Sequence, residues 1–181
     1  MTISVIKRGE YGYEQALEGL SYNKNQSKDM EKVSLKLAPM DGGHNKFLES
    51  MFVWLSVTAP RYWWQEADTY RLSTKQSEST MHTIHKRFLV TEDFEDGNIW
   101  YPYLQYLNEE LQKLMDKKTT VEDFKRKIPE SFLQKRMWCM SYKTLRNVIF
   151  QRKKHKLSNW KSFIKQTLEQ VDHPEILPKI D

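Results

Sequence analysis

A chain of 181 residues is long enough to bury one hydrophobic core, and no Gly-, Ser- or Pro-rich linker divides it, so we expect a single domain over residues 1–181. The formal net charge of +5 favours an anionic partner such as a mononucleotide, a flavin pyrophosphate or a nucleic acid, although clustered cations can equally form solvated helix faces. No apolar run is long enough to cross a membrane and the N-terminus does not look like a signal peptide, so we expect a soluble, cytoplasmic protein without a membrane partner. Cys139 is the single cysteine, which excludes an internal disulfide, and no Cys/His cluster supports a metal site.

The apolar spacing of the first sixty residues predicts short helices and strands. Residues 21–28 are polar and are expected to form a connection. Residues 52–58 are almost continuously apolar and β-branched, which predicts a strand that is covered on both faces and lies at the centre of a sheet. Before this strand, the pattern predicts a strand over residues 3–7 and helices over residues 13–20, 29–38 and 46–50, the last with Asn45 as a candidate cap.

The rest of the chain is predicted to be mostly helical. Pro60 suits the first position of a helix over residues 60–70, and the polar run over residues 71–81 is expected to be a loop. A strand is predicted over residues 134–140. Further helices are expected over residues 103–117, from a capping box at Thr120 to just before Pro129, over residues 142–152 with Ser141 as cap, and over residues 158–170 with Ser158 as cap. The sum is an α+β fold, a single domain with helices around a small central sheet.

Polar donor groups gather on either side of the expected central strand. His44 and Glu49 precede it, and the next helix leads to Arg71 and a run of Ser, Thr and Gln side chains. Guanidinium, amide and hydroxyl groups are the donors that bind phosphates, sugars and base edges. The sequence has no GxSxG, GxGxxG or Walker lysine motif, so a serine hydrolase, a Rossmann dinucleotide site and a kinase have no support.

The order of these residues resembles that of the flavin-dependent thymidylate synthases, the ThyX family. In that family a His and a Glu precede a strand, a proline and an aromatic helix, and a signature of the form RHRxxSxNExSxRY follows. His44, Glu49 and Pro60 occur in this order here, and residues 69–82 align with the signature without a gap. The resemblance spans residues 43–160. Its second block comprises Ile128-Pro129, the expected strand, Ser141, Lys143, Leu145, Arg152 and His155.

The resemblance implies the chemistry of that family. FAD would be the cofactor, methylenetetrahydrofolate the carbon donor and NADPH the reductant, and a pyrimidine deoxynucleotide like dUMP would be methylated reductively. A homotetramer with sites shared between subunits is implied as well. The implied flavin-binding residues are His44, Arg71, Gln76, Ser77 and His155. The implied substrate-binding residues are Ser79, Lys143 and Arg152, of which Arg152 is the catalytic residue that polarises the pyrimidine. The alternative for each is local: His44 caps a helix, Arg152 belongs to a basic run, and Ser77 and Ser79 bond to their own loop.

Several positions depart from the family signature. Thr69 and Met81 stand where the family has arginine, Tyr70 replaces its His, and Gln76 and Ser77 replace its Asn and Glu. In the family the lost arginines help hold the nucleotide and its phosphate, so another Lys or Arg must supply those contacts. One alternative is therefore a ThyX-fold protein without thymidylate synthase activity that binds nucleotides or nucleic acid. Another keeps the flavin and acts on a modified or cytosine-bearing nucleotide.

Overall fold

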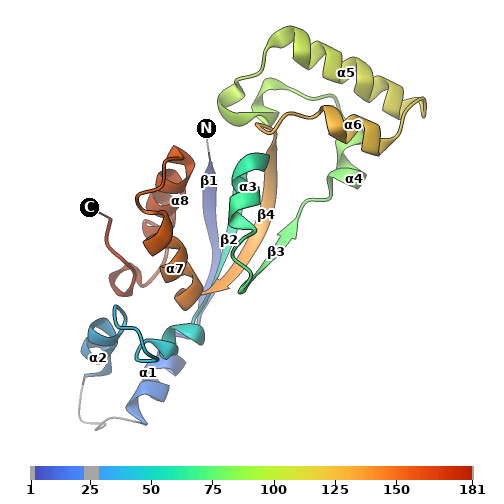
Figure 1. Ribbon diagram of the computed structural model, residues 1–181. Coiled ribbons are helices and arrows are strands. Elements are labelled where there is room, and N and C mark those ends of the chain that lie inside the picture. The colour runs from blue at the N-terminus through green and yellow to red at the C-terminus, as the bar shows by residue number, and fades with distance from the viewer. Residues whose placement is uncertain (1–2, 23–28, 181) are drawn as a thin grey trace.

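A four-stranded antiparallel sheet forms the centre of the computed structural model, which describes residues 3–22 and 29–180 (Figure 1). The strands are β1 (Ser4–Tyr11), β2 (Phe52–Pro60), β3 (Ser73–Ser77) and β4 (Leu133–Ser141). Their order in the sheet is β1-β2-β4-β3, so β2 is flanked on both sides and the prediction of a central strand is confirmed. Most of the connection expected over residues 21–28 lies outside the described residues.

Helices cover the sheet and extend beyond both of its ends. The α-helices are α1 (Tyr13–Ser21), α2 (Met30–Leu37), α3 (Arg61–Ala67), α4 (Thr80–Thr83), α5 (Tyr101–Met115), α6 (Val121–Lys127), α7 (Tyr142–Arg152) and α8 (Ser158–Leu168). Short 3-10 turns are η1 (Lys46–Glu49), η2 (Ile84–Lys86), η3 (Thr91–Asp93), η4 (Glu95–Gly97) and η5 (Pro174–Ile176). Figure 1 shows α7 and α8 against the sheet, α1 and α2 beyond one end, and α5 and α6 beyond the other. In the part of the chain that the structure describes, no helix has the length and apolar character that a bilayer crossing requires.

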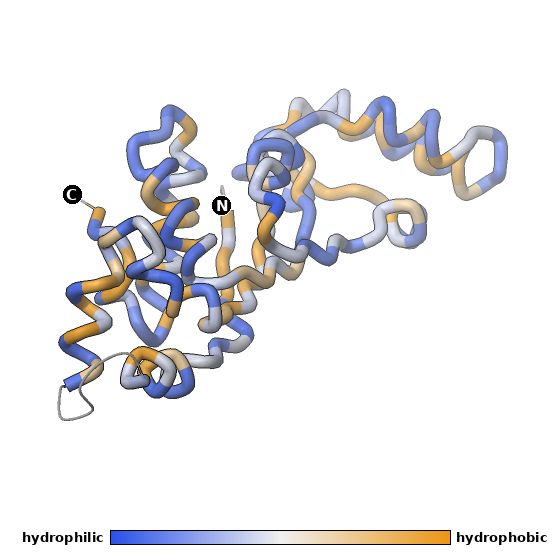
Figure 2. Tube along the Cα trace, turned by 60° about the horizontal axis from the view of Figure 1, so that its bottom comes forward, coloured by the Kyte–Doolittle hydropathy of each residue, from blue (hydrophilic) through white to orange (hydrophobic). Residues whose placement is uncertain are grey.

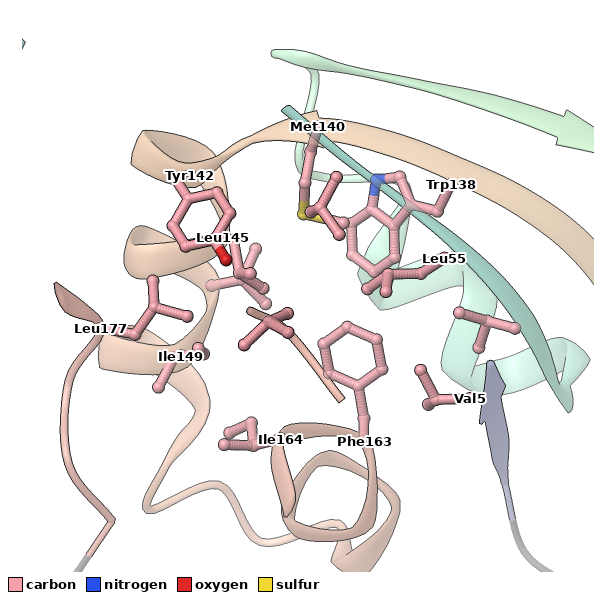
Figure 3. Packing of buried hydrophobic residues seen from close by; sticks show 14 of the residues in the cluster. Val5, Leu55, Trp138, Met140, Tyr142, Leu145, Ile149, Phe163, Ile164 and Leu177 are labelled. Carbon is pink, nitrogen blue, oxygen red and sulfur yellow. The ribbon is translucent and has the colours of Figure 1, made fainter. Parts of the chain in front are cut away.

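The main hydrophobic core lies between the sheet and helices α3, α7 and α8. Leu55 of β2 and Trp138 of β4 face each other across the sheet register, and both are fully buried. Figure 3 shows these two side chains with Phe163 of α8 in the same cluster. Trp63 and Trp160 add two more buried indoles, with ring centres 4.6 Å apart. Most of the aromatic content is therefore core, because a buried aromatic ring removes a large apolar area from water.

The opposite face of the sheet is partly open, which differs from the expectation that residues 52–58 would be covered on both faces. Phe52 is 40% exposed and Tyr11 is 70% exposed. Both rings pack instead against Trp54, with ring centres 6.3 Å and 5.9 Å away. An antiparallel sheet needs only one buried face, and cross-strand aromatic contacts shield part of the other.

Helices α5 and α6 form a second apolar cluster beyond the N-terminal end of β4. Leu107, Leu111 and Phe124 are fully buried in it. Figure 2 shows hydrophobic and hydrophilic residues alternating along α5, as expected for a helix with one buried face. The hydroxyl of Tyr62 in α3 lies 2.8 Å from both carboxylate oxygens of Glu95, which joins the main core to the chain that leads into this cluster.

Two predicted helix caps, Thr120 and Ser141, are confirmed, and three helix starts differ. The Thr120 and Ser141 side chains accept hydrogen bonds from the backbone N–H three residues later, which satisfies first-turn donors, and Asp29, predicted as the first residue of its helix, caps α2 in the same way. Ser158 is the first helical residue of α8 rather than its cap, and Pro60 precedes α3 rather than opening it. The Asn45 side chain does not cap η1. It is buried and donates to the Ala38 carbonyl 3.3 Å away, because the fold brings the end of α2 against it.

The polar run over residues 71–81 contains strand β3, so the prediction of a loop is wrong there. Ser73 pairs with Met140 and Ser77 with Arg136 of β4. A β-ladder is held by backbone hydrogen bonds, and an edge strand tolerates polar side chains because one of its sides meets solvent. The side chains of β3 do not alternate between apolar and polar, so the sequence pattern does not indicate a strand. Backbone pairing with β4 specifies the strand instead.

Candidate functional site

A cleft lies between residues 69–72, which connect α3 to β3, and the exposed side of α7. It encloses about 350 Å³, at the lower end of the range for small-molecule pockets. The Thr144 hydroxyl donates to the Leu72 carbonyl at 3.0 Å, and the Tyr70 hydroxyl donates to the Gln151 side chain at 3.1 Å. These two hydrogen bonds fix both walls. The cleft is lined by Thr69, Tyr70, Arg71, Leu72, Thr144, Asn147 and Gln151.

Arg71 is the cation of this cleft. Its side chain is exposed, and within the described residues it forms no hydrogen bond or ion pair. A guanidinium without a protein partner is free to donate to an anionic ligand, and two parallel N–H groups suit a phosphate oxygen pair. The prediction that Arg71 lies at a ligand site thus has geometric support.

Arg152, at the end of α7 and beside the cleft, is held by a network of aromatic and acidic side chains. Its Nε donates to the Tyr70 hydroxyl at 2.9 Å, and its Nη1 donates to Glu66 Oε2 at 3.0 Å. The guanidinium carbon lies 4.8 Å from the ring centre of Trp160, a cation–π arrangement. Glu66 Oε2 also accepts from the Trp160 indole N–H at 2.7 Å. Glu66 Oε2 therefore has two roles: it orients the Arg152 guanidinium, and it accepts the hydrogen bond of the Trp160 indole.

Each side chain of this pair keeps one polar atom unpaired, a donor on Arg152 and an acceptor on Glu66. Within the described chain, Arg152 Nη2 and Glu66 Oε1 have no hydrogen-bond partner. The side chains are 17% and 32% exposed, so both can reach a ligand. A pyrimidine such as uracil presents a carbonyl next to a ring N–H, and that edge complements a guanidinium N–H next to a carboxylate oxygen.

His155 lies at the same cluster, but its two ring nitrogens already have neighbours. Its Nδ1 accepts from the Leu157 backbone N–H at 3.2 Å, which places the proton of the neutral ring on Nε2. That nitrogen lies 3.5 Å from Glu66 Oε2. In this arrangement His155 supports Glu66, and no ring nitrogen is left for a further ligand unless the contact to Glu66 is given up.

Lys75 fixes the chain segment that carries the cleft. Its Nζ donates to the Tyr70 carbonyl at 3.0 Å and to the Ser73 hydroxyl at 3.2 Å, and it lies 4.9 Å from the ring centre of Trp138. Burial lowers the pKa of Lys75, and the nearby Asp68 partly opposes that change. Neither Lys75 nor Glu66 was expected at a site. The one signal for Glu66 was its place four residues before Tyr70 in a stretch that the sequence predicts to be helical, where such side chains share a face, although α3 ends at Ala67.

The remaining predicted site residues are spread over the surface. Lys143, in the first turn of α7, donates to the Asn45 side chain, which places it next to the exposed His44. Gln76, Ser77 and Ser79 are exposed on β3 and the turn after it. Among the described residues, none of these three side chains forms a hydrogen bond with Arg152 or Arg71. A single chain thus brings together Arg71, Arg152 and His155, and leaves the others apart.

The described residues contain no group of three or more His, Cys, Asp and Glu side chains placed to hold a metal ion. Burial raises the pKa of Cys139, which keeps its thiol protonated and weakly reactive.

The fold is that of a ThyX-like α+β protein. Two crystal structures of ThyX from Helicobacter pylori with FAD and dUMP superimpose on it, with TM-scores of 0.79 and 0.81 and 14% sequence identity. The first match covers 96% of this chain and 95% of that one, and the second covers 99% of each. The thymidylate synthase complementing protein family has a model that matches residues 3–175, so the chain belongs to that family. The expected family and fold class are confirmed. No curated protein matches the sequence.

Proposed function

We propose that this protein is a cytoplasmic, flavin-dependent enzyme that methylates a pyrimidine deoxynucleotide like dUMP. The observation that carries the proposal is Arg152, which Glu66 and Tyr70 hold beside the cleft with Nη2 free for a ligand. Family membership and the FAD and dUMP of the Helicobacter pylori ThyX structures agree with it. A guanidinium fixed in advance costs little reorganisation when charge develops on the pyrimidine ring, so Arg152 is the proposed catalytic residue.

The proposed cofactor is FAD, and the residues of the cleft suit part of it. Arg71 offers two parallel donors for the pyrophosphate, and the Asn147 and Gln151 amides offer donors and acceptors for a ring edge. Bound FAD would supply the redox chemistry, with methylenetetrahydrofolate and NADPH as carbon donor and reductant by family resemblance. His44, Gln76 and Ser77 remain proposed flavin contacts. For His155, the two nitrogens already engaged favour a positioning role through Glu66.

The wide spacing of the site residues supports a homotetramer with shared sites. Lys143 and Ser79 are proposed substrate contacts, yet among the residues that the structure describes neither forms a hydrogen bond with Arg152. A second subunit that supplies Ser79 would complete the site. The partly open sheet face offers apolar surface for such contacts, since Tyr11 is 70% exposed. Light scattering should give four times the chain mass, and a monomeric mass would reject this part of the proposal.

The test is flavin binding by the purified chain, followed by product formation. We expect protein incubated with FAD and then desalted to keep a flavin absorbance band. The Arg71→Gln variant should lose most of that band, whereas Arg8→Gln should keep it, because Arg8 lies on β1 away from the cleft. Protein that stays colourless after incubation with FAD would overturn the proposal.

Product formation separates catalysis from cofactor binding. With FAD, NADPH, methylenetetrahydrofolate and dUMP, the native chain should form thymidylate. Arg152→Lys should reduce the rate about 100-fold or more while the flavin band remains, because the compact ammonium of lysine lacks the planar fork of donors that spans Glu66, Tyr70 and a base. A flavin band without product from dUMP, but with product from a cytosine nucleotide, would support the changed-substrate alternative.

The alternative of a ThyX-fold binding module makes a different prediction. It requires binding to nucleotides or nucleic acid that is independent of flavin and falls steeply with salt. The basic clusters are less free than the net charge suggests, because Arg126 pairs with Glu122 and Asp123, and Lys127 pairs with Glu110. Such pairing weakens the field at these clusters and favours the enzyme proposal.

A further inference from the structure

A second pocket of about 250 Å³ lies between α3, α4, α6 and β4. Three cations from three elements line it, together with two amides and a hydroxyl. Cations from separate elements that meet around one hollow are costly to bring together unless an anion or an acid offsets them. These lining residues, termed the basic pocket below, are Arg61, Gln65, Thr80, Lys125, Gln134 and Arg136.

Arg136 is fixed in the wall of the basic pocket. Its Nη1 lies 3.0 Å and 3.1 Å from the two carboxylate oxygens of Asp68, and its Nη2 donates to Gln134 at 3.0 Å. Its guanidinium carbon lies 4.5 Å from the ring centre of Trp64. Its Nε–H is buried and has no partner in the described chain. Because this atom has almost no accessible surface, a ligand in the pocket cannot reach it, and Arg136 contributes its charge and a fixed wall to the pocket.

The other two cations leave a surplus of positive charge. Arg61 Nη1 donates to the Ile128 carbonyl at 2.8 Å, and its Nη2 lies 3.4 Å from Glu130. The Lys125 side chain has no hydrogen-bond or ion-pair partner among the described residues. Asp68 and Glu130 therefore offset two of the three cations, and the charge of Lys125 remains for a ligand.

The position of the basic pocket relates it to the altered signature. Thr80, which lines it, directly follows Ser79, the proposed nucleotide contact. The family arginines that help hold the phosphate are replaced here by Thr69 and Met81, so donors must come from elsewhere. We propose that the basic pocket binds the phosphate group of the nucleotide, with Arg61, Lys125 and Arg136 as its cations. This inference rests on the proposed function for the identity of the nucleotide, but the chemistry it requires is that of any phosphate monoester or free phosphate.

The test compares ligands with and without the phosphate on flavin-loaded protein. We expect dUMP to bind to the native chain at least about tenfold more tightly than deoxyuridine, measured by calorimetry. Lys125→Gln and Arg61→Gln should each weaken dUMP binding about tenfold and leave deoxyuridine binding unchanged. Lys135→Gln is the matched control, because Lys135 is exposed and neighbours Arg136 on β4, where successive side chains point to opposite faces. It should bind dUMP like the native chain.

The outcomes separate this inference from the proposed function. If deoxyuridine binds as tightly as dUMP, or if Lys125→Gln and Arg61→Gln bind dUMP normally, the phosphate role of the basic pocket is overturned, whatever the flavin band shows. If dUMP does not bind but inorganic phosphate raises the melting temperature of the native chain and not of Lys125→Gln, the pocket stands and the proposed nucleotide fails. If neither dUMP nor phosphate binds, the pocket proposal is wrong. Because the Lys125 side chain has no partner among the described residues, Lys125→Gln should disturb the folded protein little. Equal melting temperatures of the native chain and this variant without ligand would verify that the variant folds.

Discussion

Replacing Glu66 should show how much the hydrogen bonds and the ion pair around Arg152 contribute to the free energy of unfolding. Glu66 Oε2 accepts from Arg152 at 3.0 Å and from the Trp160 indole at 2.7 Å, and Trp160 is fully buried. Glu66→Leu preserves a similar side-chain volume but removes both acceptor contacts. Glu66→Gln keeps a carbonyl oxygen of the same shape and removes only the charge. The pair of variants therefore separates the hydrogen bond from the ion pair.

The expected costs follow from burial. An indole N–H left without a partner in the core costs about 1–3 kcal/mol. The ion pair with Arg152 adds only about 0.5–1 kcal/mol, because the two side chains are 17% and 32% exposed and water screens them. Glu66→Leu should thus lower the free energy of unfolding by about 1.5–4 kcal/mol, and Glu66→Gln by about 1 kcal/mol.

Urea unfolding followed by tryptophan fluorescence measures these differences. Glu169→Leu is the control for replacing a glutamate by leucine, because Glu169 is 59% exposed and lies 3.9 Å from its partner Lys165. It should change the stability by less than about 0.5 kcal/mol. A Glu66→Leu protein as stable as Glu169→Leu would refute the assignment of Glu66 as the acceptor that holds Arg152 and Trp160.

Two further predictions concern single positions. Burial and the hydrogen bonds to Glu95 raise the pKa of Tyr62 to about 12, so the unfolded chain loses this proton first and stability should fall between about pH 10 and pH 12. Tyr62→Phe should flatten that fall in melting curves measured over this range, and an unchanged slope would contradict the assignment. Gly12 has φ +100°, and an added Cβ would lie 2.4 Å from the Ser50 carbonyl, so Gly12→Ala should cost about 2 kcal/mol or more in urea unfolding. Gly42→Ala, with φ +68° and open space around its Cβ, is the control and should cost clearly less.

Local signals in the sequence were sufficient where they agreed with the tertiary structure. The β-branched run of residues 52–58 and the cap at Ser141 predicted β2 and the start of α7 correctly. β3 was missed because its side chains are polar, and pairing with β4 is information that only the folded chain contains. Asn45 shows the same limit: its sequence position suits a cap, but tertiary packing uses its amide against Ala38.

The candidate site likewise contains some residues that the sequence predicts and others that it does not. Family resemblance pointed to Arg71 and Arg152, and the structure places both at or beside one cleft. Glu66 and Lys75 could not be singled out, since an acid on a helix and a lysine in a polar run are ordinary surface residues until their partners are known. The partner of Glu66 that matters most, Trp160, is 94 positions away in the chain.

The pairing of charges also bears on how the protein would select a ligand. A net charge of +5 suggests general attraction to anions, yet two of the arginines at the proposed sites are paired with acids: Arg152 with Glu66 and Arg136 with Asp68. These pairs weaken the positive potential close to each arginine, because each acid cancels the field of its partner beyond a few ångströms. Specific donors remain, since Arg152 Nη2 and the Arg71 guanidinium have no partner in the described chain. Binding at the site would then depend on a ligand that reaches those individual donors, as a small nucleotide with a base edge and a phosphate can.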